Sequence, residues 1–196
     1  MPEITTNQKI DHANIQTPPG TLLVWIVVIN EILIFMSGII LIARFRHLNK
    51  STFAIEQIHL NIYFGLFYTI LLLLSGYFAA EGTKFFFQKL RKKSLIYFYC
   101  SAITGTIFLV SKFFDYQKKI NEGLSIQLND FWEYYWLATG FHYLHVLFGV
   151  FLLYAICWGI YHQNIKDPEF SIRGSVLFWH MCDLIWLFLF PIFYYR

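Results

Sequence analysis

The sequence predicts an all-α integral membrane protein, a bundle of five transmembrane helices, and three observations lead to this fold class. The 196 residues are 57% hydrophobic and 21% aromatic but only 14% charged, a composition that a soluble domain of this length does not need. The apolar residues form five separate runs, each long enough to cross about 30 Å of hydrocarbon as a helix. The charged residues gather in the shorter segments between these runs, as they do in membrane bundles.

The chain divides into a polar N-terminal tail, residues 1–20, and a membrane domain, residues 21–196. The tail has no apolar core, so it does not resemble a secretory signal, and its Pro-Pro-Gly ending breaks any helix before the membrane begins. The first span is predicted over Thr21–Ala43. It is expected to end at the basic residues that follow, which are Arg44, Arg46 and His47.

The second span is predicted over His59–Ala80, bounded by Glu81 and Gly82. A loop is expected over Lys84–Lys93, the most basic stretch of the chain. The third span is predicted over Leu95–Phe114 and is expected to end at Asp115-Tyr116, where polar residues take over.

The fourth span is predicted over Phe131–Tyr161, after a polar connection of mixed charge. It is longer than a bilayer needs, so it is expected to tilt or to project from the membrane. A short charged turn with a proline then leads to the fifth span, Ser175–Tyr195. This last span finishes in aromatic residues typical of the membrane–water interface.

Five spans place the two termini on opposite sides of the membrane. The formal net charge of +3 is mild and lies in short loops, which indicates orientation rather than nucleic-acid binding. The dense Lys84–Lys93 cluster favours a cytoplasmic location for its side. The predicted topology therefore has the N-terminus in the cytoplasm and the C-terminus in the periplasm.

Two histidines lie inside the fourth apolar run. With Ala138 and Gly149, His142 and His145 fall on one stripe of a helix, because positions three and four apart share a face. Small residues let a neighbouring helix approach closely, and polar groups in a bilayer need a partner. This face is therefore expected to meet protein rather than lipid.

Acidic residues also lie inside the membrane. Glu31 is about ten residues into the first span, where a charged carboxylate costs about 2.5–3.5 kcal/mol on insertion scales. Two interpretations stay open: a proton-handling site, or a neutral carboxyl that holds helices together. In the fifth span, His180 and Asp183 are three residues apart, so the carboxylate could orient the ring.

A third acid, Asp115, follows Lys112 by one turn at the expected helix end. This pair is interpreted as an interfacial ion pair of little energetic weight. Imidazoles that face each other across a bundle can hold a b-type haem. His142 and His145 are expected to point to nearly one place, which leaves only His180 as a deep partner. A packing or hydrogen-bonding role is therefore favoured over a metal or haem site.

Three motifs resemble subunit III of the haem–copper oxidases. Residues 139–149, TGFHYLHVLFG, are similar to that family's TGFHxLHVxxG signature. Residues 178–190, FWHMCDLIWLFLF, resemble its closing WHFVDxxWxFLF stretch, and residues 30–35, NEILIF, resemble its SExLxF helix with the buried glutamate, here Glu31. Asp115-Tyr116 stands where the family usually has Glu-Tyr. The resemblance covers the chain from about Pro19 to Tyr195 and implies the same inside-to-outside topology.

Within the family, the chain resembles the short five-span form that lacks the first two helices. Its ending, with Met181 and Pro191, is similar to the branch associated with bacterial nitric oxide reductases. Tyr143, where many oxidase members carry Gly, also favours that branch over an oxidase subunit. The alternative is subunit III of a bacterial cytochrome c or quinol oxidase, which takes part in aerobic electron transport.

The resemblance implies an accessory subunit in the bacterial inner membrane that has no redox centre and is not an enzyme by itself. It would stabilise the catalytic haem-bearing subunit of a respiratory complex, in denitrification for the nitric oxide reductase branch, and would help proton uptake. Haem and metal are expected only in that partner, and phospholipid is expected in a cleft between helices. The polar residues that would serve these roles are Glu31, Asp115, His142, His145, His180 and Asp183. Two rivals are an independent b-type cytochrome and a carrier built around Glu31, for which no broken helix or inverted repeat is found.

Overall fold

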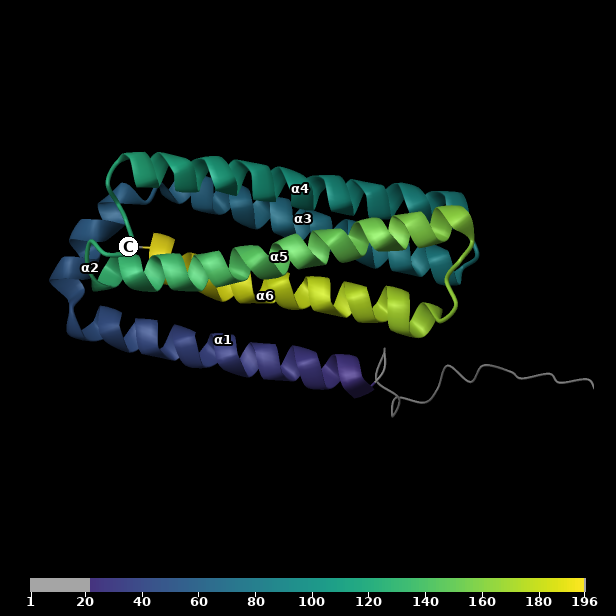
Figure 1. Cartoon of the computed structure of the whole chain (residues 1–196), viewed down its shortest axis with the longest axis horizontal. Helices are drawn as coiled ribbons and strands as arrows, with labels where there is room; N and C mark the ends of the chain where they lie inside the picture. Colours follow the sequence, from purple (N-terminus) through teal and green to yellow (C-terminus); the bar gives the residue numbers. More distant parts are fainter. Residues whose placement is uncertain (1–21, 196) are drawn as a thin grey trace, which may run out of the picture.

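The computed structural model of the chain describes residues 22–195 and consists of long helices that run side by side (Figure 1). The five long ones are α1 (Leu22–Leu48), α3 (Ile62–Phe87), α4 (Arg91–Asn121), α5 (Asp130–His162) and α6 (Ser175–Tyr194). Each is long and apolar enough to cross a membrane. The predictions of an all-α fold and five spans are confirmed, whereas the predicted tail lies outside the described residues.

Four of these helices form a closed bundle, with α1 along its side. Helix α3 packs against α4 and α6, and α5 packs against α4 and α6. Helix α1 packs mainly on α6 and touches α5, and Figure 1 shows it at the edge of the molecule. Most of the α1 side chains therefore face outward, where the bilayer would surround them. An outward face in lipid must be apolar, so this helix is apolar on nearly every face.

The first span is longer than predicted, and the segment after it is helical. Helix α1 continues past Ala43 to Leu48, and α2 (Lys50–Glu56) and the 3₁₀ turn η1 (Gln57–His59) follow. A helix must be apolar only where it meets hydrocarbon, so its basic last turn lies beyond the membrane. There Arg46 donates hydrogen bonds to carbonyl oxygens at the C-terminus of α6, at 2.8 Å for Tyr195. This contact joins the C-terminal ends of α1 and α6 and satisfies carbonyl groups that the end of α6 leaves without a helical partner.

The predicted basic loop is wrong. Helix α3 continues to Phe87 and α4 begins at Arg91, so only Gln88–Leu90 connects them. Helix α4 likewise runs on to Asn121, which puts Asp115 inside the helix rather than at its end. At the end of α3 the exposed Lys84 side chain extends toward water, whereas around Asp115 the charged side chains pair with one another inside the bundle. In neither place does the helix need to stop at the first charge.

The last two spans agree with prediction in position. Helix α5 has 33 residues, longer than a bilayer needs, as expected. A turn of π-helix, η2 (Glu169–Gly174), leads directly into α6. At the opposite end of the bundle Glu56 accepts hydrogen bonds from Asn129 (2.6 Å) and from the Trp132 indole (2.7 Å). These bonds tie α2 to the start of α5.

Helices α5 and α6 approach closely at Gly149. A Cβ built at this position would lie 2.6 Å from Cε3 of Trp179, a side chain that is 0% exposed and therefore has no room to move. The stripe predicted to face protein does so at His142 and Gly149, which are buried, whereas Ala138 and His145 are half-buried.

Replacing Gly149 by alanine is expected to lower the free energy of unfolding by about 1–3 kcal/mol, because the added methyl group must displace a fully packed indole. Gly140→Ala is the matched control on the same helix, since a Cβ there has nothing within 4 Å. It should leave stability unchanged or raise it by up to about 1 kcal/mol through helix propensity. Unfolding in detergent measures both, and equal effects would contradict the close-contact explanation.

Candidate functional site

A polar contact deep in the apolar region joins helices α1 and α5. Oε2 of Glu31 lies 3.2 Å from Nε2 of His145, and the two side chains are 22% and 13% exposed. The ring of Phe35, one turn further along α1, packs edge-on against the His145 ring at 5.2 Å. The structure therefore gives Glu31 a partner on another helix, which the sequence alone does not identify.

The hydrogen bond at the other ring nitrogen of His145 determines which nitrogen carries a hydrogen. Nδ1 of His145 is 2.9 Å from the carbonyl oxygen of Phe141, and since a carbonyl can only accept, Nδ1 carries a hydrogen. If the ring is neutral, Nε2 is bare and can accept only from a protonated Glu31. If the ring is charged, Glu31 is the carboxylate. Oε2 of Glu31 is buried and forms no hydrogen bond of regular geometry among the described residues, so the pair is a close contact between two ionisable groups.

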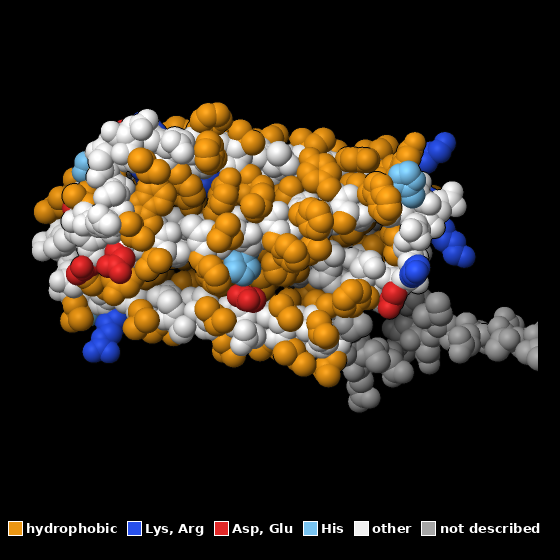
Figure 2. Space-filling model, in the orientation of Figure 1, with side chains coloured by type: hydrophobic (Ala, Val, Ile, Leu, Met, Phe, Trp, Pro, Cys, Tyr) orange, Lys and Arg blue, Asp and Glu red, His pale blue; other side chains and the backbone are white. Residues whose placement is uncertain are grey.

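Apolar grooves lie on both sides of this pair. One groove, of about 330 Å³, is lined by α1, α5 and α6, on residues 34–42, 134–141 and Leu189. The other, of about 290 Å³, is lined by residues 23–28, 148–152 and 170–178. Glu31 and His145 fall between these ranges on their helices. Figure 2 shows a histidine and an acidic side chain side by side in the middle of an otherwise apolar face.

The second histidine of the motif, His142, lies deeper in the bundle than His145, although both rings lie against Phe35 of α1, at 6.4 Å and 5.2 Å. His142 is 1% exposed, and its ring stacks on Trp186 of α6 at 5.4 Å. The edge of Phe108 on α4 is 6.3 Å away. Residues three apart on a helix differ by about 60° in direction, which is enough to send one ring into the bundle and the other to α1.

The predicted contact between His180 and Asp183 is present. Nδ1 of His180 lies 3.4 Å from Oδ2 of Asp183, with the carboxyl buried and the ring 43% exposed. Gly76 of α3 makes room for this carboxyl, because a Cβ at that position would collide with Oδ2. The pair lies on α6 against α3, so it is separate from the Glu31–His145 pair.

The interpretation of Lys112–Asp115 as an interfacial pair of little weight is wrong. The Lys112 side chain is 1% exposed, and its Nζ lies 3.0 Å from Oδ2 of Asp115. It also donates to the hydroxyl groups of Tyr135 and Tyr194, each at 3.0 Å. Three acceptors match the three hydrogens of a charged ammonium group. Lys119, one helical turn later, is buried as well and donates to the other oxygen of Asp115.

Aromatic rings enclose this buried ammonium group. Nζ of Lys112 lies within 6 Å of the ring centroids of Tyr68, Tyr116, Tyr135, Trp186 and Tyr194, at distances where a ring attracts a cation. The rings come from α3, α4, α5 and α6, so the cluster joins all four bundle helices. The sequence signal that could have revealed it is the spacing of Lys112, Asp115 and Lys119, which places three charges on one helix face.

The arrangement of the membrane histidines bears on cofactor binding. Among residues 22–195, no group of three or more His, Cys, Asp or Glu side chains lies close enough to hold a metal ion. His142 stacks on Trp186, whereas His145 and His180 each face a carboxyl group. The three imidazoles thus have different stacking or polar partners, and this geometry does not favour a shared haem.

Comparison with known proteins agrees on one family. A family model described as cytochrome c oxidase subunit III matches residues 20–196. The chain is 34% identical to a cytochrome c oxidase subunit 3 of Schizophyllum commune, over 66% of this chain and 48% of that protein. It is 26% identical to a protein of the same name from Corynebacterium diphtheriae, over 87% of this chain and 85% of that protein. A probable quinol oxidase subunit 3 of Staphylococcus saprophyticus is 22% identical over 66% of this chain and 65% of its own length.

The length of the matched regions differs among these relatives. The chain spans about half the length of the fungal relative but most of the corynebacterial one. All three motifs of the sequence, around Glu31, His145 and Asp183, lie inside the residues that the family model matches.

Proposed function

The chain belongs to the cytochrome c oxidase subunit III family, and from this we propose that it is an accessory subunit of a haem–copper-type respiratory complex. In this proposal the chain packs beside a catalytic haem-bearing subunit, stabilises it and assists its proton uptake. Haem and metal belong to that partner. The family and the five membrane helices support this role, and the partner itself is part of the proposal.

The observation that carries the proton role is the Glu31–His145 pair. Its two facing atoms lie 3.2 Å apart, and both side chains remain partly exposed where α1 meets α5. Intramembrane ionisable groups that pair with each other are typical of proton relays. A proton could pass to or from this pair without either residue leaving its helix.

The two grooves beside the pair support the prediction of bound phospholipid. Both are lined almost entirely by apolar side chains, and both lie along helices at bilayer depth. Acyl chains fill such grooves at low cost because their surface is as apolar as the walls. Lipid bound there would shield the Glu31–His145 pair from the bulk bilayer.

The finer prediction is that the complex is a nitric oxide reductase in the bacterial inner membrane. It rests on the resemblance of the C-terminal motif, with Met181 and Pro191, and on Tyr143. The relatives reported above carry oxidase names, which favours a cytochrome c or quinol oxidase as the partner. The proposed orientation places the end that carries Lys89 and Arg91 in the cytoplasm.

Replacing Glu31 by glutamine is expected to lower proton-coupled turnover of the complex without lowering the amount assembled, because glutamine keeps the shape but cannot carry the proton. Stopped-flow proton uptake and steady-state turnover measure this. Glu133→Gln is the matched control, since that acid is exposed in the first turn of α5. In a double-mutant cycle, the effects of His145→Gln and Glu31→Gln on the free energy of unfolding should differ from additivity by about 0.5–3 kcal/mol. Turnover equal to that of the control would overturn the proton role.

Purification in mild detergent tests the accessory role itself. A tagged chain is expected to bring down a haem-bearing subunit, and mass spectrometry of that subunit distinguishes nitric oxide reductase from oxidase. If the chain came down alone with a haem Soret band, it would be a b-type cytochrome. If it came down alone and colourless, a carrier built around Glu31 would become the better explanation.

A further inference from the structure

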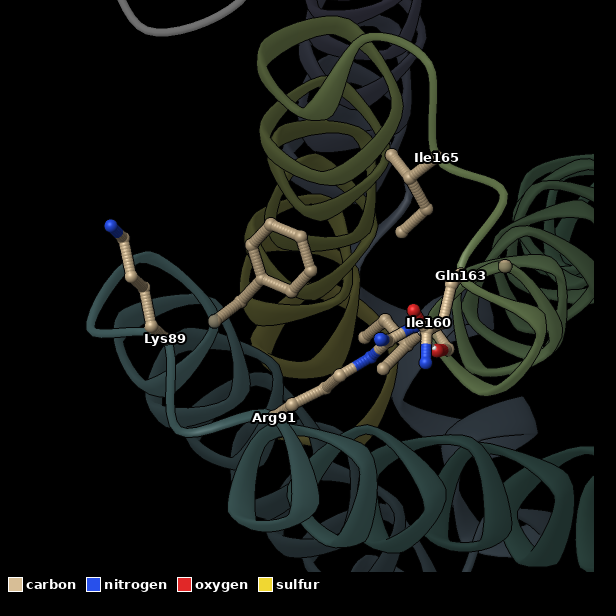
Figure 3. Close-up of a pocket in the computed structure, with 7 residues that line it drawn as sticks. Lys89, Arg91, Ile160, Gln163 and Ile165 are labelled. Atoms are coloured by element: carbon tan, nitrogen blue, oxygen red, sulfur yellow. Dashed lines mark hydrogen bonds between the residues drawn. The ribbon is translucent and has the colours of Figure 1, made fainter.

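A pocket of about 410 Å³ opens at the end of the bundle where α3 meets α4 and α5 ends. Its walls combine apolar side chains, Phe86, Ile160 and Ile165, with the polar Lys89, Arg91 and Gln163. Figure 3 shows Arg91 reaching from α4 across to the end of α5, beside Gln163. The lining residues are neutral or basic, so the pocket is cationic at its rim and apolar in its wall.

The backbone at this pocket is unusual. Lys89 and Gln163 have φ of 63° and 59°, and within residues 22–195 they are the two non-glycine residues with positive φ. Each ends a helix in the left-handed conformation, where glycine is normally preferred because it has no Cβ. Both side chains line the same pocket. Retaining a long polar side chain at both positions is unfavourable for the backbone, which indicates a role for the side chains themselves.

Arg91 is held in place across the pocket. Its Nη2 donates to the carbonyl oxygen of Ile160 at the C-terminus of α5, which leaves further guanidinium hydrogens for a second acceptor. Lys92 and Lys93 follow on exposed positions of α4. Asp167, on the connection after α5, accepts a hydrogen bond from the backbone of Phe170 at 3.2 Å. None of the residues that line the pocket is acidic, so the lining itself supplies no anion for Lys89 and Arg91.

We propose that this pocket binds a phosphate group, supplied by the headgroup of an anionic phospholipid. Arg91 would hold the phosphate oxygens and the Gln163 amide could donate to the glycerol oxygens. Lys89, whose side chain points away from Arg91 in Figure 3, would add positive charge at the rim of the pocket. The acyl chains would leave along Phe86 and Ile165 toward the hydrocarbon. Basic pockets between helices at the membrane surface suit such headgroups. This inference does not depend on which complex the chain joins.

The test measures lipid binding to the full chain, purified in uncharged detergent together with whatever complex it forms. Phosphatidylglycerol, phosphatidylcholine and inorganic phosphate are each titrated and followed by native mass spectrometry. Wild-type protein is expected to prefer phosphatidylglycerol. Lys89→Gly should weaken that binding about fivefold, the usual effect of one basic residue near an anionic surface. Its thermal stability should not fall, since glycine suits the left-handed backbone.

Lys92→Gln is the control, because it removes the same charge from the same cluster outside the pocket, and it should change binding much less than Lys89→Gln. Arg91→Gln should weaken binding too. If Lys92→Gln and Lys89→Gln lowered the affinity for phosphatidylglycerol equally, the effect would be one of general surface charge, and the proposed site would be overturned. Equal affinity for the two lipids, with displacement by inorganic phosphate, would assign the pocket to free phosphate and overturn the lipid proposal.

Discussion

An Asp115→Asn variant is expected to lose about 3–5 kcal/mol of its free energy of unfolding, the cost of leaving buried charge without its partner. Asp115 is the carboxylate between Lys112 and Lys119, whose side chains are 1% and 6% exposed. Asparagine keeps the size of the side chain but leaves two buried ammonium groups close together with no anion between them. The aromatic cage and the two tyrosine hydroxyl groups around Lys112 cannot replace a full negative charge.

Unfolding of the variants in detergent, followed by circular dichroism, measures this loss. Lys118→Gln is the control on the same helix, because its pair with Glu122 is 3.8 Å apart and the lysine is 70% exposed. Such a pair contributes at most about 1 kcal/mol. Asp115→Glu should recover most of the stability, because it restores the carboxylate. An Asp115→Asn variant as stable as the Lys118→Gln control would show that the cluster is not a buried ionic centre.

The five spans could be predicted from the sequence because hydrocarbon imposes its own length on apolar runs. The helix ends could not, since charged residues such as Arg46 and Lys84 continue a helix into water as readily as they end it. The short α2 (Lys50–Glu56) could not be predicted either, because the contact that positions it is remote in sequence. Its position depends on Glu56 bonding to the start of α5, a contact 73 residues away along the chain.

The candidate site could be predicted only in part. Residue type and depth single out Glu31, and the three-residue spacing pairs His180 with Asp183. The partner of Glu31 and the separate directions of His142 and His145 depend on where α1 and α6 lie. Sequence spacing within one helix does not contain that information. The cage around Lys112 is assembled from rings on four helices, so it becomes visible only in three dimensions.

The Trp186 side chain is expected to be the other large contributor to stability, because it contacts both the buried His142 ring and the Lys112 ammonium group. Its ring, 1% exposed, stacks on His142 at 5.4 Å and lies 5.5 Å from the Lys112 ammonium group. Its Nε1 donates to the hydroxyl of Thr69 on α3 at 3.0 Å. Trp186→Ala should therefore lower the free energy of unfolding by about 3–5 kcal/mol, as large buried aromatic truncations do.

Two further variants separate the causes of this loss. Trp158→Ala removes the same side chain from α5 at a position that is 60% exposed, so it should have little effect on unfolding. Trp186→Phe keeps most of the ring but loses the donor to Thr69, which should cost about 1 kcal/mol beyond the packing change. If Trp186→Ala were no worse than Trp158→Ala, the stacked His142 ring would not depend on this indole. The edge-on rings of Phe108 and Phe35, 6.3 Å and 6.4 Å from the histidine ring, would then be its main support inside the bundle.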